Sequence, residues 1–291
     1  MIFQGSAVAL VTPFNKSNEV DYYSLKNMID FQIASGTKAL VILGTTGEAS
    51  TITNEERTKI IKFVVCLAKN KIKIIVGTGS NSTQTAKKFS QEAEKLGADG
   101  VLVVTPYYNK SNKLGLFEHF KQIATAINIP MILYNVPSRT GVNLLPETVL
   151  KLSKIKNIVG IKEASGNLLQ MAELIHSLPI KMAVYSGDDG LTLPALALGA
   201  SGVISVTANC YPEEISALCD FALCGDFHNA RRIHKKLFHV NQAMFFDVNP
   251  ICVKAYLNLL GFSVGKPRLP LVEADSNLTN KLKEVKINYE N

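Results

Sequence analysis

Short runs of apolar, mostly β-branched residues recur along the first 205 residues of the chain, separated by segments in which apolar residues return every three or four positions. Such runs are typical of buried strands, and the segments between them are typical of amphipathic helices. Eight runs begin 20 to 34 residues apart, close to the repeat of about 30 residues in a βαβ unit. They are Ala7–Thr12, Ala39–Leu43, Lys73–Gly77, Gly100–Thr105, Pro130–Asn135, Ile158–Lys162, Met182–Ser186 and Gly202–Ser205. The alternation predicts eight parallel strands joined by right-handed helical crossovers.

The segments between the runs carry helix start and stop signals. Ser24 stands where it can cap a helix that Gly36 ends. Thr53 and Glu56 have the spacing of a capping box, and Pro146 stands where a first helical residue is expected. We therefore expect a helix to cover each strand.

The strands are apolar along nearly their whole length, so both of their faces must be covered. A closed (β/α)8 TIM barrel covers them most economically, and a doubly wound open sheet is the alternative. After Ser205 the strand pattern stops, and residues 212–291 read almost entirely as helix. We expect a catalytic barrel at residues 1–224 and a C-terminal helical extension at residues 225–291.

The composition is typical of a soluble globular protein, with 291 residues of which 47% are hydrophobic and 19% are charged. This excludes disordered, collagen-like and coiled-coil proteins. The net charge of +7 favours anionic ligands only over long range. The basic run from Arg231 to Lys236 lacks interleaved aromatic residues, so we interpret it as a solvated helix face and expect no nucleic-acid partner.

The five cysteines are odd in number and contain no C-x-x-C pair, which favours a reducing compartment over a disulfide framework. No basic segment precedes a leader-like apolar stretch, and no run of about 18 apolar residues exists. We expect a cytoplasmic protein with no membrane partner.

Lys162 is the polar residue that stands out most, because it ends an otherwise apolar strand. Period-two alternation points it the same way as Ile158 and Gly160, toward the barrel interior if Val159 and Ile161 face the helices. An apolar interior disfavours the charged form of an amine, and a neutral amine is the nucleophile of Schiff-base chemistry. Gly160 would leave room for a small substrate. The alternative is a strand-end lysine whose ammonium reaches solvent.

Other polar groups follow the strands, where barrel active sites lie. Tyr134 ends the neighbouring strand and faces inward by the same alternation, so it can pass the protons that imine formation requires. The turn Gly44–Gly47 offers backbone N–H groups and hydroxyls for a small carboxylate. None of the five histidines follows a strand, so we expect a lysine-based mechanism without metal or cofactor.

Six motifs together carry a resemblance to a known family. They are GTTGE at 44–48, TPYYNK at 105–110, YNVPSRTG at 134–141, GIKEASG at 160–166, SGDD at 186–189 and GVISVTAN at 202–209. The chain resembles the dihydrodipicolinate synthase family of pyruvate-dependent class I aldolases. The resemblance implies condensation of pyruvate with L-aspartate semialdehyde, the committed step toward diaminopimelate and lysine.

Carried onto this sequence, the family's catalytic roles fall on four residues. The resemblance implies that Lys162 forms the Schiff base and that Tyr134 relays protons with Thr45 and Tyr108. Tyr108 would reach in from a neighbouring subunit, which implies a homo-oligomer, a tetramer built from dimers.

The binding roles that the resemblance implies fall on three further residues. Thr46 would hold the pyruvate carboxylate, the backbone of Ile204 would line the same pocket, and Arg139 would meet the carboxylate of the semialdehyde. Sialic acid lyases and keto-deoxy-sugar aldolases remain alternatives, but they typically lack the Ser-Arg-Thr-Gly sequence at 138–141. A non-catalytic barrel that binds keto acids is a further alternative, for which loss of Lys162 or Tyr134 would be expected.

The resemblance also bears on feedback control by lysine. In lysine-sensitive relatives the position of Thr85 is commonly a glutamate, which pairs with the ammonium group of the bound lysine. In this chain Arg57 adds positive charge nearby. We therefore expect weak or absent inhibition, unless Glu48 or Glu55 replaces the missing carboxylate.

Overall fold

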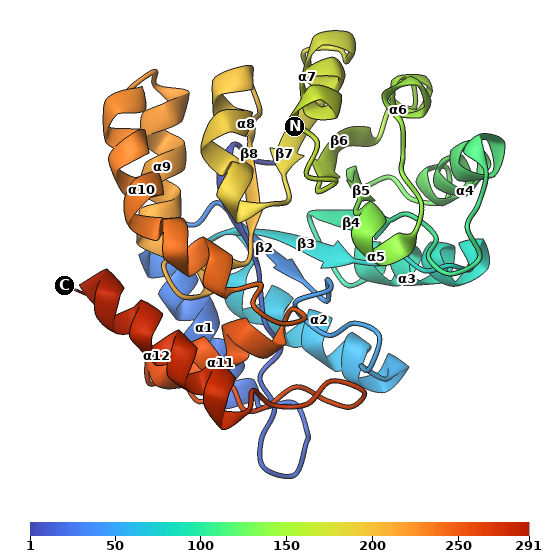
Figure 1. The fold of residues 1–291 in the computed structure, drawn as a ribbon. Coiled ribbons are helices and arrows are strands. Elements are labelled where there is room, and N and C mark those ends of the chain that lie inside the picture. The colour runs from blue at the N-terminus through green and yellow to red at the C-terminus, as the bar shows by residue number, and fades with distance from the viewer. Residues whose placement is uncertain (291) are drawn as a thin grey trace.

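Eight parallel strands close into a barrel in the computed structural model, which describes residues 1–290. Each strand pairs with the next, and the eighth pairs with the first (Figure 1). The strands are β1 (Gly5–Ala9), β2 (Ala39–Ile42), β3 (Lys73–Gly77), β4 (Gly100–Val104), β5 (Met131–Asn135), β6 (Ile158–Glu163), β7 (Ala183–Ser186) and β8 (Gly202–Ser205). The (β/α)8 prediction is confirmed, and the open sheet is wrong.

A helix follows each strand and covers it from outside. In the barrel these helices are α1 (Tyr22–Ala34), α2 (Asn54–Ala68), α3 (Thr83–Lys95), α4 (Lys113–Ala124), α5 (Pro137–Thr140), α6 (Pro146–Leu152), α7 (Leu168–Ser177), α8 (Thr192–Leu198) and α9 (Pro212–Leu223). The single turns η1 (Asp189–Leu191) and η2 (Thr207–Asn209) lie after β7 and β8. The C-terminal extension adds α10 (Phe227–Ala243), α11 (Ile251–Leu259) and α12 (Ser276–Glu290).

The helix start signals are confirmed in two of the three cases. Thr53 and Glu56 form a reciprocal capping box at α2, and Pro146 is the first residue of α6. The prediction for Ser24 is wrong, because Asp21 caps α1 and accepts a hydrogen bond from the Ser24 N–H at 3.0 Å. With Asp21 as the N-cap, the helix begins at Tyr22, which leaves Ser24 inside the first turn.

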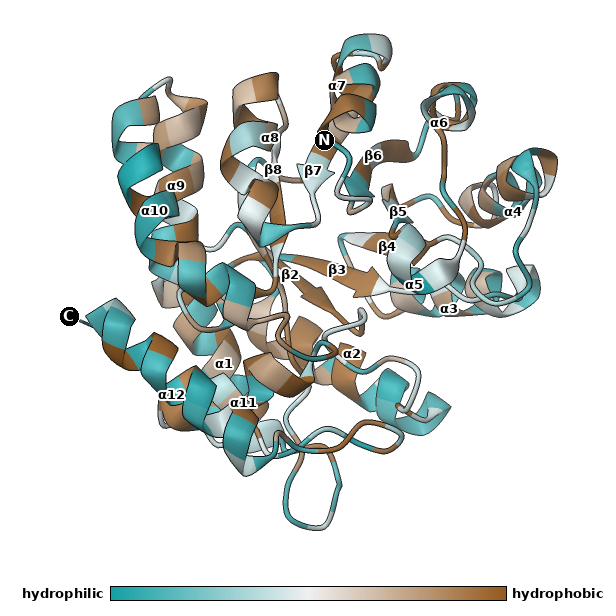
Figure 2. Cartoon of the chain, in the orientation of Figure 1, coloured by the Kyte–Doolittle hydropathy of each residue, from teal (hydrophilic) through white to brown (hydrophobic). Residues whose placement is uncertain are grey.

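The strands separate two apolar layers, one inside the barrel and one beneath the helices. Along β2, Ala39 and Val41 belong to the interior cluster, whereas Leu40 and Ile42 pack in the outer cluster. Figure 2 shows the hydrophobic strands at the centre and helices that are hydrophilic on their outer faces. Because the side chains of a strand alternate, each residue's position in the sequence decides whether it can reach the barrel interior.

One strand departs from strict alternation. The pairing of β5 with β6 shifts at Met131, so that Met131 pairs with Ile158 while Ile132 pairs with Gly160. Val159 is the extra residue of this bulge and packs against the interior cluster, while Ile158 packs in the outer one. The predicted inward position of Ile158 is therefore wrong, but the prediction holds from Gly160 onward.

The interior is filled toward the amino-terminal side of the barrel. Phe3 stacks on Tyr185 with ring centroids 4.3 Å apart, and the Tyr185 hydroxyl donates to the Phe3 carbonyl at 2.7 Å. A Cβ on Gly160 would lie 3.3 Å from the Tyr185 ring and 2.9 Å from the Ala183 carbonyl oxygen. Gly160 thus makes room for Tyr185 and not for a substrate, which corrects that expectation.

In the extension, α10 packs against α9, and α12 packs against α10 and α11 in the region of α1 (Figure 1). No helix among residues 1–290 is both long and apolar enough to cross a membrane.

Candidate active site

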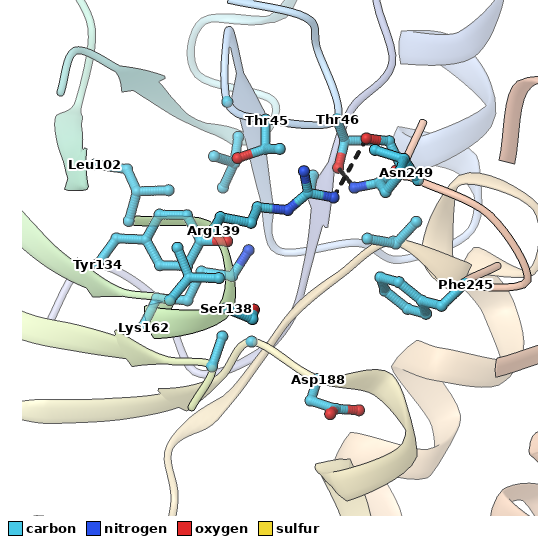
Figure 3. A pocket seen from close by; sticks show the side chains of 18 of the residues that line it. Thr45, Thr46, Leu102, Tyr134, Ser138, Arg139, Lys162, Asp188, Phe245 and Asn249 are labelled. Carbon is cyan, nitrogen blue, oxygen red and sulfur yellow. Dashed lines mark hydrogen bonds between the residues drawn. The ribbon is translucent and has the colours of Figure 1, made fainter. Parts of the chain in front are cut away.

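A cavity of about 590 Å³ opens at the carboxyl ends of the strands. Its lining comes from β1, β2, β4, β5 and β6, from the segments after β2, β5, β6, β7 and β8, and from the extension. Five of the seven predicted site residues line it together: Thr45, Thr46, Tyr134, Arg139 and Lys162 (Figure 3). Residues distant in sequence are therefore brought to one site by barrel closure.

Lys162 lies inside the barrel, as the strand pattern predicted. Its side chain is buried, and its Nζ lies 4.5 Å from the centroid of the Tyr134 ring. The two residues are register partners on β5 and β6, so the strand pairing itself sets them side by side. The geometry gives an amine and a phenol that share one cavity.

Gly187 supplies the space that the Lys162 side chain occupies. A Cβ at this position would lie 2.9 Å from Lys162 Cε and 2.6 Å from the Ala164 Cβ. Any larger residue at 187 would therefore displace the lysine. The glycine of the SGDD motif is explained by this close approach.

The carboxylate next to Lys162 in the sequence faces away from the cavity. Glu163 is buried and accepts hydrogen bonds from Asn135 Nδ2 at 3.0 Å, Gln170 Nε2 at 3.1 Å and the Ser165 N–H at 2.7 Å. These donors are neutral, and no carboxylate within residues 1–290 forms an ion pair with Lys162. The amine is left available to a substrate.

The turn after β2 presents Thr45 and Thr46 to the cavity. Leu43 and Glu48, on either side of them, have positive φ angles of 54° and 57°, a region that non-glycine residues rarely adopt. Thr46 is buried, and its Oγ1 accepts a hydrogen bond from Asn249 Nδ2 at 2.9 Å. The turn is thus a strained segment held by contacts from elsewhere in the chain.

Arg139 lies in the single-turn helix α5 and reaches across the cavity mouth. Its Nη2 donates to the main-chain carbonyl of Asn249 at 3.3 Å (Figure 3). The guanidinium keeps further donors free, and its planar fork suits a carboxylate.

Two predicted residues do not line this cavity. Tyr108 is 89% exposed on the loop after β4, at a φ of 73°. Ile204 is fully buried in the barrel-interior cluster, and Val206 lines the cavity beyond it. A single copy of the chain therefore leaves the Tyr108 phenol in solvent.

Asp189, the second aspartate of the SGDD motif, holds the segment after β8. Asp189 is buried, and its Oδ2 accepts hydrogen bonds from the N–H groups of Val206 and Thr207 at 2.9 and 3.0 Å. Burial raises the pKa of this carboxyl above its ordinary value. Asp189 fixes the segment after β8, while its neighbour Asp188 lines the cavity.

The sequence pattern missed a segment of the extension that covers the mouth. Between α10 and α11, the residues Phe245, Asp247, Val248 and Asn249 line the cavity. No strand precedes them, so the rule that locates polar residues at strand ends passes them over. The Asn-Pro pair at 249–250 is a turn signal that could have indicated a loop here, but it does not indicate a role in the site.

The structure also shows whether side chains are placed to bind a metal ion. Within residues 1–290, no three His, Cys, Asp or Glu side chains lie close enough together to hold a metal ion.

Comparisons with known proteins show the family of the chain. The Dihydrodipicolinate synthetase family matches residues 2–287. The 4-hydroxy-tetrahydrodipicolinate synthase of Clostridium novyi is 48% identical over 288 residues, covering 99% of this chain and 97% of the relative. That of Citrifermentans bemidjiense is 50% identical over 290 residues, covering 98% and 100%.

Solved structures of this family are also similar to the chain. The dihydrodipicolinate synthase of Aquifex aeolicus superposes with a TM-score of 0.97 at 47% identity, covering 99% of this chain and 98% of its own. That of Acinetobacter baumannii, complexed with pyruvate, gives a TM-score of 0.97 at 44% identity, covering 99% of each chain. The predicted resemblance to this family is confirmed. The chain belongs to the dihydrodipicolinate synthetase family, the pyruvate-dependent lyases of aldolase type that act in diaminopimelate and lysine biosynthesis.

Proposed function

We propose that Lys162 is the residue through which the chain condenses pyruvate with L-aspartate semialdehyde. The observation that carries this assignment is the buried Lys162 amine, which shares a cavity with the Tyr134 phenol and has no carboxylate partner within the described residues. Schiff-base chemistry requires an amine that can reach the keto carbon, and no carboxylate holds the Lys162 amine away from a substrate in this cavity.

The proposed reaction begins when Lys162 Nζ attacks the keto carbon of pyruvate, and the carbinolamine loses water to give an imine. Removal of a methyl proton converts the imine to an enamine, whose carbon attacks the aldehyde. The amine of the semialdehyde then attacks the imine carbon, which closes the ring and releases Lys162. Tyr134 and Thr45 carry the protons, with Tyr108 completing the relay.

The two substrate carboxylates occupy different ends of the cavity in this proposal. Thr46 and the turn amides hold the carboxylate of pyruvate, next to the backbone of Ile204. Arg139 at the mouth pairs with the carboxylate of the semialdehyde. The Arg139 guanidinium favours an aldehyde that carries a carboxylate over an uncharged sugar aldehyde.

We propose that the functional form is a homotetramer built from dimers. Tyr108 is exposed in one copy, so a second copy has to bring it to a cavity. A solved relative described as the first monomeric dihydrodipicolinate synthase variant implies that assembly is normal among such enzymes.

We also propose a cytoplasmic location, with no nucleic-acid or membrane partner and no cofactor. All five cysteines are free thiols, which suits a reducing compartment. The division into a catalytic barrel at residues 1–224 and an extension at 225–291 remains a proposal of the same kind.

Borohydride reduction in the presence of pyruvate should trap a covalent adduct on Lys162. Intact-protein mass spectrometry measures the added mass, and peptide mapping locates it. The Lys162→Ala variant should give no adduct, whereas Lys88→Ala, which removes an exposed lysine of α3, should label as the unaltered chain does. An adduct on another lysine, or none at all, would refute the Schiff-base assignment.

Replacing Arg139 by alanine should cripple condensation but spare imine formation, because the guanidinium is assigned to the second substrate. A charge-assisted hydrogen bond contributes about 1.5 to 3 kcal/mol, so we expect kcat/KM for the semialdehyde to fall at least about tenfold. Arg139→Lys keeps the positive charge but loses the planar, two-pronged geometry of the guanidinium. Its kcat/KM for the semialdehyde should lie between those of the unaltered enzyme and Arg139→Ala. An equal loss of pyruvate trapping would instead place Arg139 at the first substrate.

Replacing Tyr108 by phenylalanine should lower kcat about tenfold or more with little change in thermal stability, because it removes one hydroxyl from the proton relay. Tyr23→Phe, which alters an exposed tyrosine of α1, is the matched control and should leave kcat unchanged. Light scattering at the assay concentration should find an oligomer. Full activity in a monomer would contradict the shared site.

Lysine should inhibit the enzyme weakly or not at all. The solved dihydrodipicolinate synthase of Cyanidioschyzon merolae has lysine bound. Here Thr85 and Arg57 line a hollow of about 620 Å³, and Thr85 offers a hydroxyl in place of a carboxylate. Arg57 is buried, donates to the Gly77 carbonyl at 2.9 Å, and has its pKa lowered by burial to about 10. Glu48 is paired with Lys254 at 2.6 Å and cannot replace the missing acid.

Loss of one charge-assisted contact, about 1.5 to 3 kcal/mol, should weaken lysine binding roughly 10- to 150-fold. Initial rates across a lysine titration measure this, and Thr85→Glu should make inhibition stronger. Inhibition of the unaltered enzyme at sub-millimolar lysine would contradict the prediction.

A further inference from the structure

A buried ion pair joins the C-terminal extension to the turn after β2. Lys254 Nζ lies 2.6 Å from Glu48 Oε1, and the two side chains are 1% and 2% exposed. Lys254 belongs to α11, and Glu48 is the last residue of the GTTGE motif. Neither residue lines the cavity of about 590 Å³ that holds Lys162.

Other groups complete the surroundings of this pair. The Arg268 N–H donates to Glu48 Oε2 at 2.8 Å, and Lys254 Nζ donates to the Lys266 carbonyl at 3.3 Å. Lys254 Nζ lies 4.1 Å from the centroid of the Phe14 ring. Burial lowers the pKa of Lys254 to about 8, and the neighbouring Glu48 carboxylate opposes this shift. Both oxygens of the Glu48 carboxylate are therefore held by the extension.

The same turn has a second attachment to the extension, and its backbone needs one. Asn249 Nδ2 donates to Thr46 Oγ1 at 2.9 Å, two residues before Glu48. Glu48 itself has a φ of 57°, a conformation that persists only where surrounding contacts enforce it. The extension thus contacts the turn at two residues. Asn249 binds Thr46, which faces the cavity (Figure 3), and Lys254 pairs with Glu48, which faces away from it.

We propose that Lys254 is a positioning residue that, through Glu48, holds the turn in the shape that receives the carboxylate of pyruvate. This rests on the proposed function, in which pyruvate lies at Thr46. Removing the Lys254 charge leaves a buried carboxylate unpaired, and the turn must shift to hydrate it. A shift of the turn misplaces Thr46 and its neighbouring amides, which weakens pyruvate binding while the Lys162 and Tyr134 chemistry remains.

The test compares four variants with the unaltered enzyme. Lys254→Met and Glu48→Gln each break the charge pair at nearly constant volume, and the double variant removes both charges. Lys73→Met is the matched control, because Lys73 pairs with Asp99 at 3.7 Å at the start of β3, far from the cavity mouth. The readouts are kcat, both KM values, the pyruvate concentration that half-saturates borohydride trapping, and the thermal midpoint.

We expect each single variant to raise the KM and the half-saturating concentration of pyruvate at least about fivefold. Both kcat and the KM for the semialdehyde should change less than about twofold, a split that general loss of structure would not produce. The double variant should be no worse than the worse single variant, because the two residues act through one contact. Lys73→Met should match the unaltered enzyme.

The proposal would be overturned if the KM for pyruvate were unchanged in both single variants. It would also be overturned if the increase in this KM in the double variant equalled the product of the increases in the two single variants. If Lys254→Met fails to fold, the KM for pyruvate of Glu48→Gln decides the test, because the glutamine amide retains the shape of the carboxylate. An unaltered enzyme that traps no pyruvate refutes the proposed function, and the positioning role with it. Normal trapping together with unchanged variants refutes the positioning role alone.

Discussion

Closure of the barrel is the constraint on which the rest of the structure depends. A closed parallel sheet pairs the backbone of every strand and leaves no edge, so each strand side chain points either into the barrel or toward the covering helices. Phe3 and Tyr185 fill the interior toward the amino-terminal side. The carboxyl ends are what remains, and there Lys162, Tyr134 and the turn after β2 come together without being near in sequence.

The site also depends on a part of the chain outside the barrel. The turn that carries Thr45 and Thr46 contains backbone conformations that cost energy, at Leu43 and Glu48. Contacts from residues about 200 positions later stabilise it, by an amide on Thr46 and an ammonium on Glu48. The extension therefore contributes to the geometry of the site and to the lining of its mouth, in addition to packing.

The sequence predicted those features that follow from local periodicity. Strands β3 and β8 begin and end where the apolar runs do, and the inward direction of Lys162 and Tyr134 followed from alternation. The inward prediction failed at Ile158, where a bulge inserts one residue, and the cap prediction failed at Ser24, where Asp21 competed. No local signal identified Asn249, because its contact with Thr46 spans 203 residues and exists only once the barrel has closed and the extension has packed.

The phase of β6 decides which of two adjacent, oppositely charged residues enters the site. Lys162 and Glu163 are neighbours in sequence, so the sheet sends them to opposite faces. Three neutral donors hold Glu163 on the outer face, and there its charge cannot pair with the amine. A strand shifted by one residue would put the carboxylate beside Tyr134 and the amine among those donors, where neither could form a Schiff base. The bulge at Val159 lies three residues before Lys162. The phase that matters is therefore the one from Gly160 onward, which the pairing with Ile132 and Tyr134 sets.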